Sequence, residues 1–456
     1  MLLLVGIILF VVSIICLIQK KYVYSTFLFV LFGTKGLSIL PENLGGLKLS
    51  HLAFVYVIIF TALEFQKIRV KYKSNKTAKY LKWLLVFFLT SILVSIVYYN
   101  YPVIDSITTG LRYFVLLSFF VFSPLSLSDY QKLLKWLFYL TLVTSILYIL
   151  QCIIGVQLLA YSLTVYEQPT ENGLFRFYNQ PPLTTLFLYP CFFYKEMLPK
   201  RYRIIAAIVF LLTIFLSNGR TSIITMVLTF VGIALLCGNM KQSLGVIALL
   251  LLIFLFVQPY VMSRMTNSGK TSQDIELVFQ GAYSQADYQA KGGYTMLYRL
   301  AWLNERWNYL NKRPLIEKLY GLGLLPDEHP IVHKKYHFRY GLVDEETGYT
   351  AQMRTPDIAW GNFLTCYGLL GTVLFLIFYL SLIKTTYRLR KDSNLAKILF
   401  VTLCMNIVDS FAGALLSEPY SLVGLFLFYN YMIKLHESRQ SFNNGNNRLL
   451  QCTKLY

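Results

Sequence analysis

Long apolar runs separated by short polar loops, and interrupted once by a long polar segment, constrain this chain more than any other feature. A helix needs about twenty predominantly apolar residues to cross the hydrocarbon core of a bilayer, and many runs come near that length. Residues 264–357 hold no such run, so we expect this segment to fold outside the membrane. No strand-like alternation of polar and apolar residues runs through the apolar stretches. We therefore predict α-helical membrane spans.

Composition agrees with a polytopic membrane protein. Of the 456 residues, 56% are hydrophobic and only 14% are charged, which is too apolar for a soluble globular chain. The net charge of +20 does not indicate nucleic-acid binding, because most basic residues lie in short loops between apolar runs. All cysteines but one lie in apolar runs, and that one is in the C-terminal tail, so neither a disulfide framework nor a zinc–cysteine site is predicted.

The prediction is an all-α polytopic protein with roughly twelve to fourteen membrane helices, thirteen being favoured. The N-terminal run has neither a basic leading region nor a small-residue cleavage site, so we interpret it as a retained span. The predicted spans are residues 2–18, 22–40, 49–65, 81–99, 107–124, 137–158, 182–194, 204–216, 222–237, 244–262, 358–383, 398–416 and 420–433.

Lysine and arginine concentrate in every second loop, which is the pattern of the cytoplasmic side. This pattern places the long polar segment outside the cytoplasm and the C-terminus inside it. The side on which the first helix begins depends on whether every early run crosses. We expect ten membrane helices over residues 1–262, a large extracytoplasmic loop over 263–357, three more helices over 358–435, and a flexible polar tail over 436–456.

Two arginines stand where an anion could bind at the outer boundary of the membrane. Arg176 lies shortly before Pro181 and Pro182, which suit the N-terminus of a helix, and helix N-termini favour phosphate. Arg220 lies in a tight turn between two apolar runs. A charge inside the bilayer costs on the order of 3 kcal/mol, so such residues usually have a partner or a function. The alternative for both is an interface anchor that extends its charge toward water.

Two further cations, Arg112 and Lys35, lie within apolar runs. Arg112 is expected to point to the same cavity, whereas Lys35 can equally mark a loop. Several arginines that converge on one outer-leaflet cavity would form a pyrophosphate site that needs no metal ion. No aspartate-rich cluster suited to magnesium is present in the sequence, and no cofactor is predicted.

The long polar segment supplies the remaining candidates. His329, His333 and His337 are spaced by four, so they would share one face of a helix and could bind zinc, although Pro330 disrupts that pattern. Exposed surface residues are the other interpretation, and one histidine could serve as a catalytic base. Asp357 is a second candidate base, or else a helix N-cap. Aromatic residues such as Trp302 could stack on sugars, or form packing and interface contacts.

The order of these features resembles the bacterial O-antigen polymerase and O-antigen ligase superfamily, including the Wzy-type polymerases, over about residues 170–385. The resemblance depends on the order and placement of several short motifs. They are Phe-Arg-Phe-Tyr-Asn-Gln-Pro at 175–181, Leu-Ser-Asn-Gly-Arg-Thr-Ser at 216–222, Tyr-Arg-Leu-Ala-Trp at 298–302, Arg-Pro at 313–314, Gly-Leu-Gly at 321–323, Gly-Asn-Phe-Leu at 361–364 and Tyr-Gly-Leu-Leu-Gly at 367–371.

Members of that superfamily are similar to C-type glycosyltransferases and transfer an undecaprenyl-diphosphate-linked glycan to an acceptor hydroxyl. The resemblance implies that Arg176, Arg220 and Arg299, with Arg112, hold the diphosphate. It also implies glycan contacts for Tyr178, Trp302 and Asn362. Many members, the ligases especially, have a histidine directly before the asparagine that matches Asn362. This chain has Gly361 there, which leaves the catalytic base open among Asp357 and the three histidines.

The expected function is polymerisation of undecaprenyl-diphosphate-linked oligosaccharide repeats into a surface polysaccharide at the outer face of the cytoplasmic membrane. The alternatives are an O-antigen ligase, which transfers the finished glycan to a lipid acceptor, and a transporter of lipid-linked oligosaccharides. The expected partners are the lipid-linked glycan and the bilayer, with a polysaccharide copolymerase as a candidate regulator of chain length.

Overall fold

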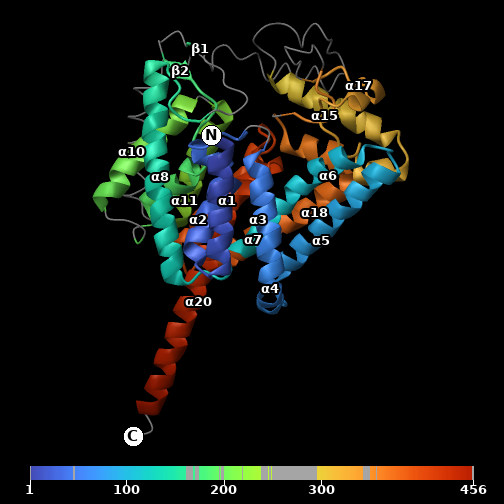
Figure 1. The fold of residues 1–456 in the computed structure, drawn as a ribbon. Coiled ribbons are helices and arrows are strands. Elements are labelled where there is room, and N and C mark those ends of the chain that lie inside the picture. The colour runs from blue at the N-terminus through green and yellow to red at the C-terminus, as the bar shows by residue number, and fades with distance from the viewer. Residues whose placement is uncertain are drawn as a thin grey trace.

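A computed structural model describes residues 2–44, 47–160, 168–169, 174–194, 196, 200–217, 219–237, 245, 248, 295–341, 350–355 and 357–453. Regular structure within these residues is almost entirely helical (Figure 1). The one strand pair described is antiparallel, between β1 (Gln168–Pro169) and β2 (Phe175–Arg176). The predicted all-α class is thus observed in its coarse form.

A helix lies on each predicted apolar run except 244–262, which falls outside the described residues apart from 245 and 248. The first half holds α1 (Leu2–Ile18), α2 (Tyr22–Gly33), η1 (Lys35–Ser38), α3 (Leu49–Leu63), α4 (Phe65–Lys71), α5 (Lys76–Val97), α6 (Val103–Leu111), η2 (Arg112–Leu117), α7 (Ser118–Val121) and α8 (Leu127–Ile154). The second half holds α9 (Thr184–Phe193), α10 (Lys200–Ser217), α11 (Arg220–Cys237), α15 (Thr295–Asn311), α16 (Leu315–Tyr320), α17 (Pro330–Lys335), α18 (Ala359–Leu389), α19 (Asn394–Asp409), η3 (Leu415–Ser417) and α20 (Ser421–Thr453).

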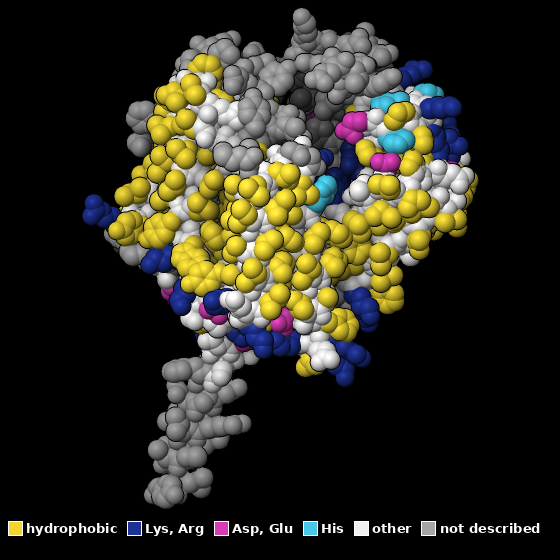
Figure 2. All heavy atoms as spheres, in the orientation of Figure 1, with side chains coloured by type: hydrophobic (Ala, Val, Ile, Leu, Met, Phe, Trp, Pro, Cys, Tyr) yellow, Lys and Arg dark blue, Asp and Glu magenta, His cyan; other side chains and the backbone are white. Residues whose placement is uncertain are grey.

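Four helical segments of the described chain are long and apolar enough to cross a membrane. They are α5, the continuous segment Val103–Val121, α8 and α18; the pair α3 and α4, bent by 76°, makes a fifth if it counts as one span. Large apolar side chains cover much of the face seen in Figure 2. Many large apolar side chains are exposed, and Val97 and Leu235 are about three-quarters exposed. Apolar surfaces of this extent indicate a membrane protein.

In two of the apolar runs the α-helix is interrupted near the lysine or arginine that the run contains. The run that contains Lys35 ends as an α-helix at Gly33, and Lys35 and Leu37 then adopt positive φ angles. Lys35 forms a salt bridge of 3.2 Å with Glu42 and lies in the short 3₁₀ turn η1, outside the α-helix. The run that contains Arg112 changes there from α-helix to 3₁₀-helix.

The C-terminal tail, expected to be flexible from residue 436, is helical as far as Thr453. The helix is nucleated by the packed first half of α20, and each added residue then gains one backbone hydrogen bond. The segment contains no proline and only one glycine, Gly445, so nothing in its sequence stops the helix. Figure 1 shows the helix projecting from the end of the molecule that carries α4.

Residues 295–341 and 350–355 form a polar lobe that docks on α5 and α18 through two glycines. Gly321 has a φ of 76°, and a β-carbon there would lie 2.4 Å from the carbonyl oxygen of Thr365. Gly368 interrupts α18 with a φ of 63°. Both positions need glycine because the two backbones approach too closely for a side chain. The amide of Leu322 then donates to Thr365 O at 2.6 Å, which fixes the lobe on α18.

Candidate anion-binding site

Four buried polar residues, Tyr113, Thr355, Asn362 and Ser417, form one hydrogen-bonded network that joins η2, the end of the polar lobe, α18 and η3. Asn362 Oδ1 accepts from the amide of Thr355 at 2.8 Å, and Asn362 Nδ2 donates to Thr355 O at 2.8 Å and to Ser417 Oγ at 3.1 Å. The hydroxyl of Tyr113 donates to Ser417 O at 3.0 Å. We call these four residues the buried network.

Three members of the buried network stand next to a charged residue in the sequence. Arg112 precedes Tyr113, Arg354 precedes Thr355, and Glu418 follows Ser417. Arg112 also donates from Nη2 to the hydroxyl of Tyr113 at 3.2 Å. Arg354 lies within electrostatic range of Arg112, and Glu418 within range of Arg112. The network therefore brings two guanidinium groups and one carboxylate together from three distant segments.

The two guanidinium groups are not neutralised by the protein that the structure describes. Arg112 Nε, and Arg354 Nε and Nη2, are buried and have no hydrogen-bond partner among the described residues. Neither arginine has a described carboxylate within 4 Å. Both arginines are partly buried, and a cation removed from water without an ion-pair partner carries a desolvation cost. Two such cations near each other also repel. This arrangement favours an anion that can accept hydrogen bonds from both arginines.

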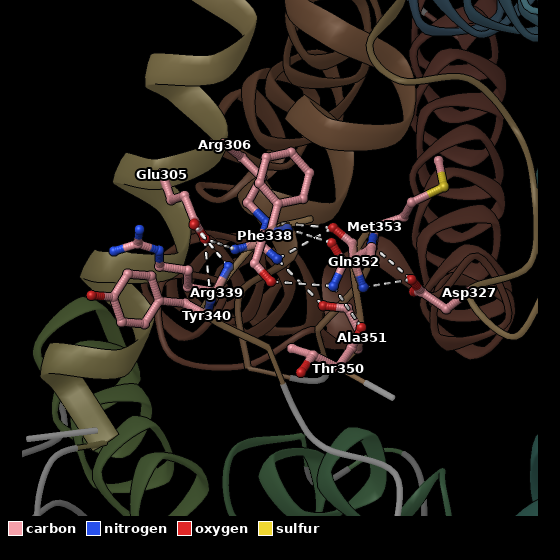
Figure 3. A network of polar contacts seen from close by, with 10 residues as sticks. All are labelled: Glu305, Arg306, Asp327, Phe338, Arg339, Tyr340, Thr350, Ala351, Gln352 and Met353. Carbon is pink, nitrogen blue, oxygen red and sulfur yellow. Dashed lines mark hydrogen bonds and ion pairs between the residues drawn. The ribbon is translucent and has the colours of Figure 1, made fainter. Parts of the chain in front are cut away.

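The segment before Arg354 is held from both sides (Figure 3). Asp327 Oδ1 accepts from the amides of Gln352 and Met353 at 2.9 and 2.7 Å. Gln352 Oε1 accepts from the amide of Phe338 at 2.7 Å. Because these contacts fix the backbone up to Met353 and the buried network fixes Thr355, the backbone of Arg354 has little freedom to move. Figure 2 shows a hollow beside the polar lobe with Lys and Arg side chains inside it.

Arg306 supports this segment from the core of the lobe. Its guanidinium is fully buried between the rings of Trp302 and Phe338, 4.3 Å from each ring centre, and pairs with Glu305 at 2.7 Å. It also donates to the carbonyl oxygen of Ala351 at 3.3 Å (Figure 3). Trp302 is itself fully buried. Its ring therefore packs the lobe and has no face exposed to a sugar, contrary to the glycan contact expected for it.

Asn362 also differs from its expected glycan role. Both ends of its side-chain amide are used within the buried network, and the side chain is buried. It acts as a positioning residue for the segment that carries Arg354. The preceding residue, Gly361, lies against Trp302: a β-carbon there would lie 2.4 Å from Trp302 Cζ3. A larger side chain at position 361 cannot be accommodated while Trp302 occupies this place.

Arg299 and Asp357 pair with each other at 3.4 Å and lie beside the same segment. The amide of Asp357 donates to Thr355 Oγ1 at 3.2 Å, and Ile358, not Asp357, is the N-cap of α18. Arg299 also acts electrostatically on Asp409, which accepts a hydrogen bond of 3.2 Å from Thr225 in α11. Arg299 and Asp357 are thus engaged with each other through Nη2 and Oδ1. The Nε atom of Arg299 is buried and has no hydrogen-bond partner among the described residues.

Arg176, in β2, contacts the end of α10, and Arg220 begins α11 three residues later in the sequence than that end. Arg176 Nε donates to the carbonyl oxygen of Ser217, the last residue of α10, at 3.1 Å, and its guanidinium lies 4.5 Å from the ring of the half-exposed Tyr178. Arg220 is the first residue of α11, but its side chain lies outside what the structure describes. Thr225 follows about 7.5 Å further along the helix, so α11 connects this pair to Asp409 and Arg299.

The three histidines do not share a helix face. His329 is the N-cap of α17, where Nδ1 accepts from the amide of Ile331 at 3.2 Å, and its Nε2 lies 3.7 Å from Asp105. His333 lies inside the helix, and His337 lies beyond its end and is exposed. Among the described residues, no group of three His, Cys, Asp or Glu side chains could hold a metal ion.

Sequence reasoning missed Arg354 and Glu418. Arg354 is one of many basic residues in the long polar segment, and nothing in its immediate sequence distinguishes it. Glu418 is a lone acidic residue in the short loop between the last two apolar runs, a position that could have drawn attention to it. Comparison of the sequence with protein-family models and with curated proteins finds no match.

Proposed function

We propose that this protein is a membrane glycosyltransferase that polymerises undecaprenyl-diphosphate-linked oligosaccharide units at the outer face of the cytoplasmic membrane. The observation that carries the proposal is that the buried network brings Arg112 and Arg354 together, while Arg112 Nε and Arg354 Nε and Nη2 have no hydrogen-bond partner among the described residues. A diphosphate is the anion that suits two neighbouring guanidinium groups, because each can donate two parallel hydrogen bonds to phosphate oxygens.

The chemistry that this pair supports is displacement of a lipid diphosphate from an anomeric carbon. An acceptor hydroxyl attacks the carbon while the bond to the phosphate oxygen breaks, so negative charge grows on the leaving group. Fixed guanidinium groups stabilise that charge more in the transition state than in the ground state. The rigid mounting of Arg354 supports this role, because preorganised donors need no rearrangement during the reaction.

The proposed topology has thirteen spans, with the polar lobe outside and the C-terminus inside the cytoplasm. It is supported by the distribution of basic residues. Lys67, Arg69 and Lys71 lie on α4, and Lys and Arg side chains gather at the end of the molecule that carries α4 and α20 (Figures 1 and 2). The polar lobe lies at the opposite end (Figure 1). Basic loops remain on the cytoplasmic side during insertion.

Polymerisation is preferred to ligation because of Gly361. The resemblance to O-antigen enzymes associates the ligases with a histidine at this position. Here Trp302 fills the space in which such a side chain would stand. The ligase reaction uses the same anion chemistry, so the products have to distinguish the two. A polymerase lengthens the glycan on the carrier lipid, whereas a ligase transfers it to another lipid acceptor.

The test uses purified protein in liposomes with the lipid-linked oligosaccharide that accumulates in cells lacking this chain. Arg354→Gln and Arg112→Gln should each lower turnover about a hundredfold, the usual effect of removing one charge-stabilising donor. They should also weaken binding of undecaprenyl diphosphate. Arg354→Lys keeps the charge but loses the two-pronged geometry, so it should remain impaired.

Arg339→Gln is the matched control, since Arg339 lies on the same lobe but is exposed. It should retain wild-type turnover and binding. The proposal fails if Arg112→Gln and Arg354→Gln both form polymer at the wild-type rate. It also fails if wild-type protein shows no binding of undecaprenyl diphosphate above that of the double variant.

A further inference from the structure

Displacement by a hydroxyl group releases a proton, so the site needs a group that accepts it. This inference depends on the proposed function and asks which residue takes that role. Carboxylates are suited to it when they are ionised, close to the reacting atoms and not already engaged by a partner. Four described carboxylates lie on the segments around the anion site: Asp105, Asp357, Asp409 and Glu418.

Three of these carboxylates are already engaged. Asp357 pairs with Arg299 at 3.4 Å, and Asp409 accepts a hydrogen bond of 3.2 Å from Thr225. Asp105 lies 3.7 Å from the imidazole of His329, the N-cap of α17. Taking a proton at any of them would weaken a contact that holds the fold together.

Glu418 differs from the other three. Its carboxylate has no described cation within 4 Å and receives no described hydrogen bond, and the residue is partly exposed. The preceding residue joins it to Arg112, because the carbonyl oxygen of Ser417 accepts from the Tyr113 hydroxyl, to which Arg112 also donates. Glu418 is therefore accessible and unengaged beside the anion site.

The backbone around Glu418 is fixed. Its amide donates to Leu415 O at 3.2 Å, and its carbonyl oxygen accepts from the amide and hydroxyl of Ser421 at 3.0 and 2.6 Å. The preceding Ser417 is held by Tyr113 and Asn362 of the buried network. Pro419 follows and restricts the backbone further. This mounting fixes the backbone of Glu418 beside the buried network, which limits where its carboxylate can reach.

We infer that Glu418 is the catalytic general base of this site. The acceptor hydroxyl oxygen forms a bond to the anomeric carbon, and its proton passes to a Glu418 carboxylate oxygen. The bond between the anomeric carbon and the phosphate oxygen breaks, and the electron pair leaves with the lipid diphosphate. Arg112 and Arg354 hold the charge of the departing group. The glutamic acid then returns the proton to water.

The test separates substrate binding from turnover. Glu418→Gln keeps the size and polarity of the side chain but removes its basicity. Turnover should fall by about a hundredfold to ten-thousandfold, the usual contribution of a general base. Binding of undecaprenyl diphosphate should remain unchanged or become tighter, because a negative charge is removed beside an anion. Glu437→Gln, which alters an exposed carboxylate on the C-terminal helix, is the matched control and should match wild type.

A second variant guards against a purely structural effect. Glu418→Ala leaves room for a small carboxylate, so added formate should restore part of its turnover but none of the turnover lost in Arg354→Gln. Wild-type turnover in Glu418→Gln overturns the inference, as does lost diphosphate binding or absent formate rescue. If instead the arginine variants are active and bind normally, the proposed function itself fails.

Discussion

Asn362 and Ser417 are 55 residues apart in the sequence, yet the side-chain amide of Asn362 donates to the Ser417 hydroxyl at 3.1 Å. This bond joins the first turn of α18 to η3. The other contacts of Asn362 reach Thr355 in the polar lobe. One buried amide therefore fixes the relative position of three segments, each of which carries part of the candidate anion site.

Replacing Asn362 should weaken both the fold and the site. Asn362→Ala removes three buried hydrogen bonds, two to the backbone of Thr355 and one to Ser417 Oγ, and each lost bond costs about 1 kcal/mol. We expect a lower thermal midpoint in detergent and weaker binding of undecaprenyl diphosphate. Asn308→Ala removes an exposed hydrogen bond to Asn304 and serves as the control. Equal midpoints for the two variants would argue against the positioning role of Asn362.

Gly361 should tolerate no side chain while Trp302 keeps its place. Gly361→Ala puts a β-carbon 2.4 Å from Trp302 Cζ3, and such overpacking costs about 1–3 kcal/mol. The thermal midpoint should fall, and Trp302→Phe in the same chain should recover part of the loss by making room. Gly413→Ala is the control, because its β-carbon would make only ordinary contacts. A stable Gly361→Ala variant contradicts the tight packing.

The sequence was informative about helices and much less so about the site. Apolar runs predict helices because burial in lipid demands internal backbone hydrogen bonds. Arg112 was recognisable because a cation in an apolar run is costly. Arg354 carried no such signal, since its importance arises from its proximity to Arg112 across the fold. Trp302 was misjudged because an aromatic ring in a polar segment has the same sequence signature whether it is exposed or packed beneath a guanidinium.

Asp327 should affect anion binding by supporting the backbone that leads to Arg354. Its carboxylate accepts from the amides of Gln352 and Met353, so Asp327→Ala leaves both amides unpaired and loosens the segment that carries Arg354. We expect undecaprenyl diphosphate to bind several-fold more weakly and the lobe to be cleaved faster in limited proteolysis. Glu328→Ala, at the exposed neighbouring carboxylate, should change neither. Unaltered binding in Asp327→Ala would show that Arg354 does not depend on this support.

The final prediction concerns alkaline pH and the contact between the polar lobe and the end of α5. The hydroxyls of Tyr101 and Tyr336 are 2.8 Å apart and both lie within 3.0 Å of the carbonyl oxygen of Leu322. Burial raises the pKa of both tyrosines well above the ordinary value of 10, and for Tyr336 the neighbouring Tyr101 raises it further. Both hydroxyls therefore stay neutral in the folded protein at pH values where they ionise in the unfolded chain.

The sign of the effect follows from proton counting. Below pH 10 both states hold the tyrosine protons, and the stability contribution is constant. Above pH 10 the unfolded state loses these protons first, so the free energy of unfolding falls as pH rises. Lys335 lies 3.5 Å from the Tyr101 hydroxyl, and burial lowers the pKa of this lysine from its ordinary value of 10.5. Just below pH 10.5 the unfolded state therefore holds the lysine proton more tightly than the folded state, so this group makes the free energy of unfolding rise with pH. The decline should therefore become steep only above that value.

The measurement is the thermal midpoint of the detergent-solubilised protein across this pH range. The double variant Tyr101→Phe, Tyr336→Phe loses about 1 kcal/mol per hydrogen bond at neutral pH, but its midpoint should decline less steeply above pH 10 because two ionising groups are gone. Tyr24→Phe, which removes an exposed hydroxyl, should decline like wild type. If the thermal midpoints of wild type and the double variant decline in parallel above pH 10, other groups govern the alkaline transition. The neutral hydroxyls of Tyr101 and Tyr336 would then not be what holds the lobe.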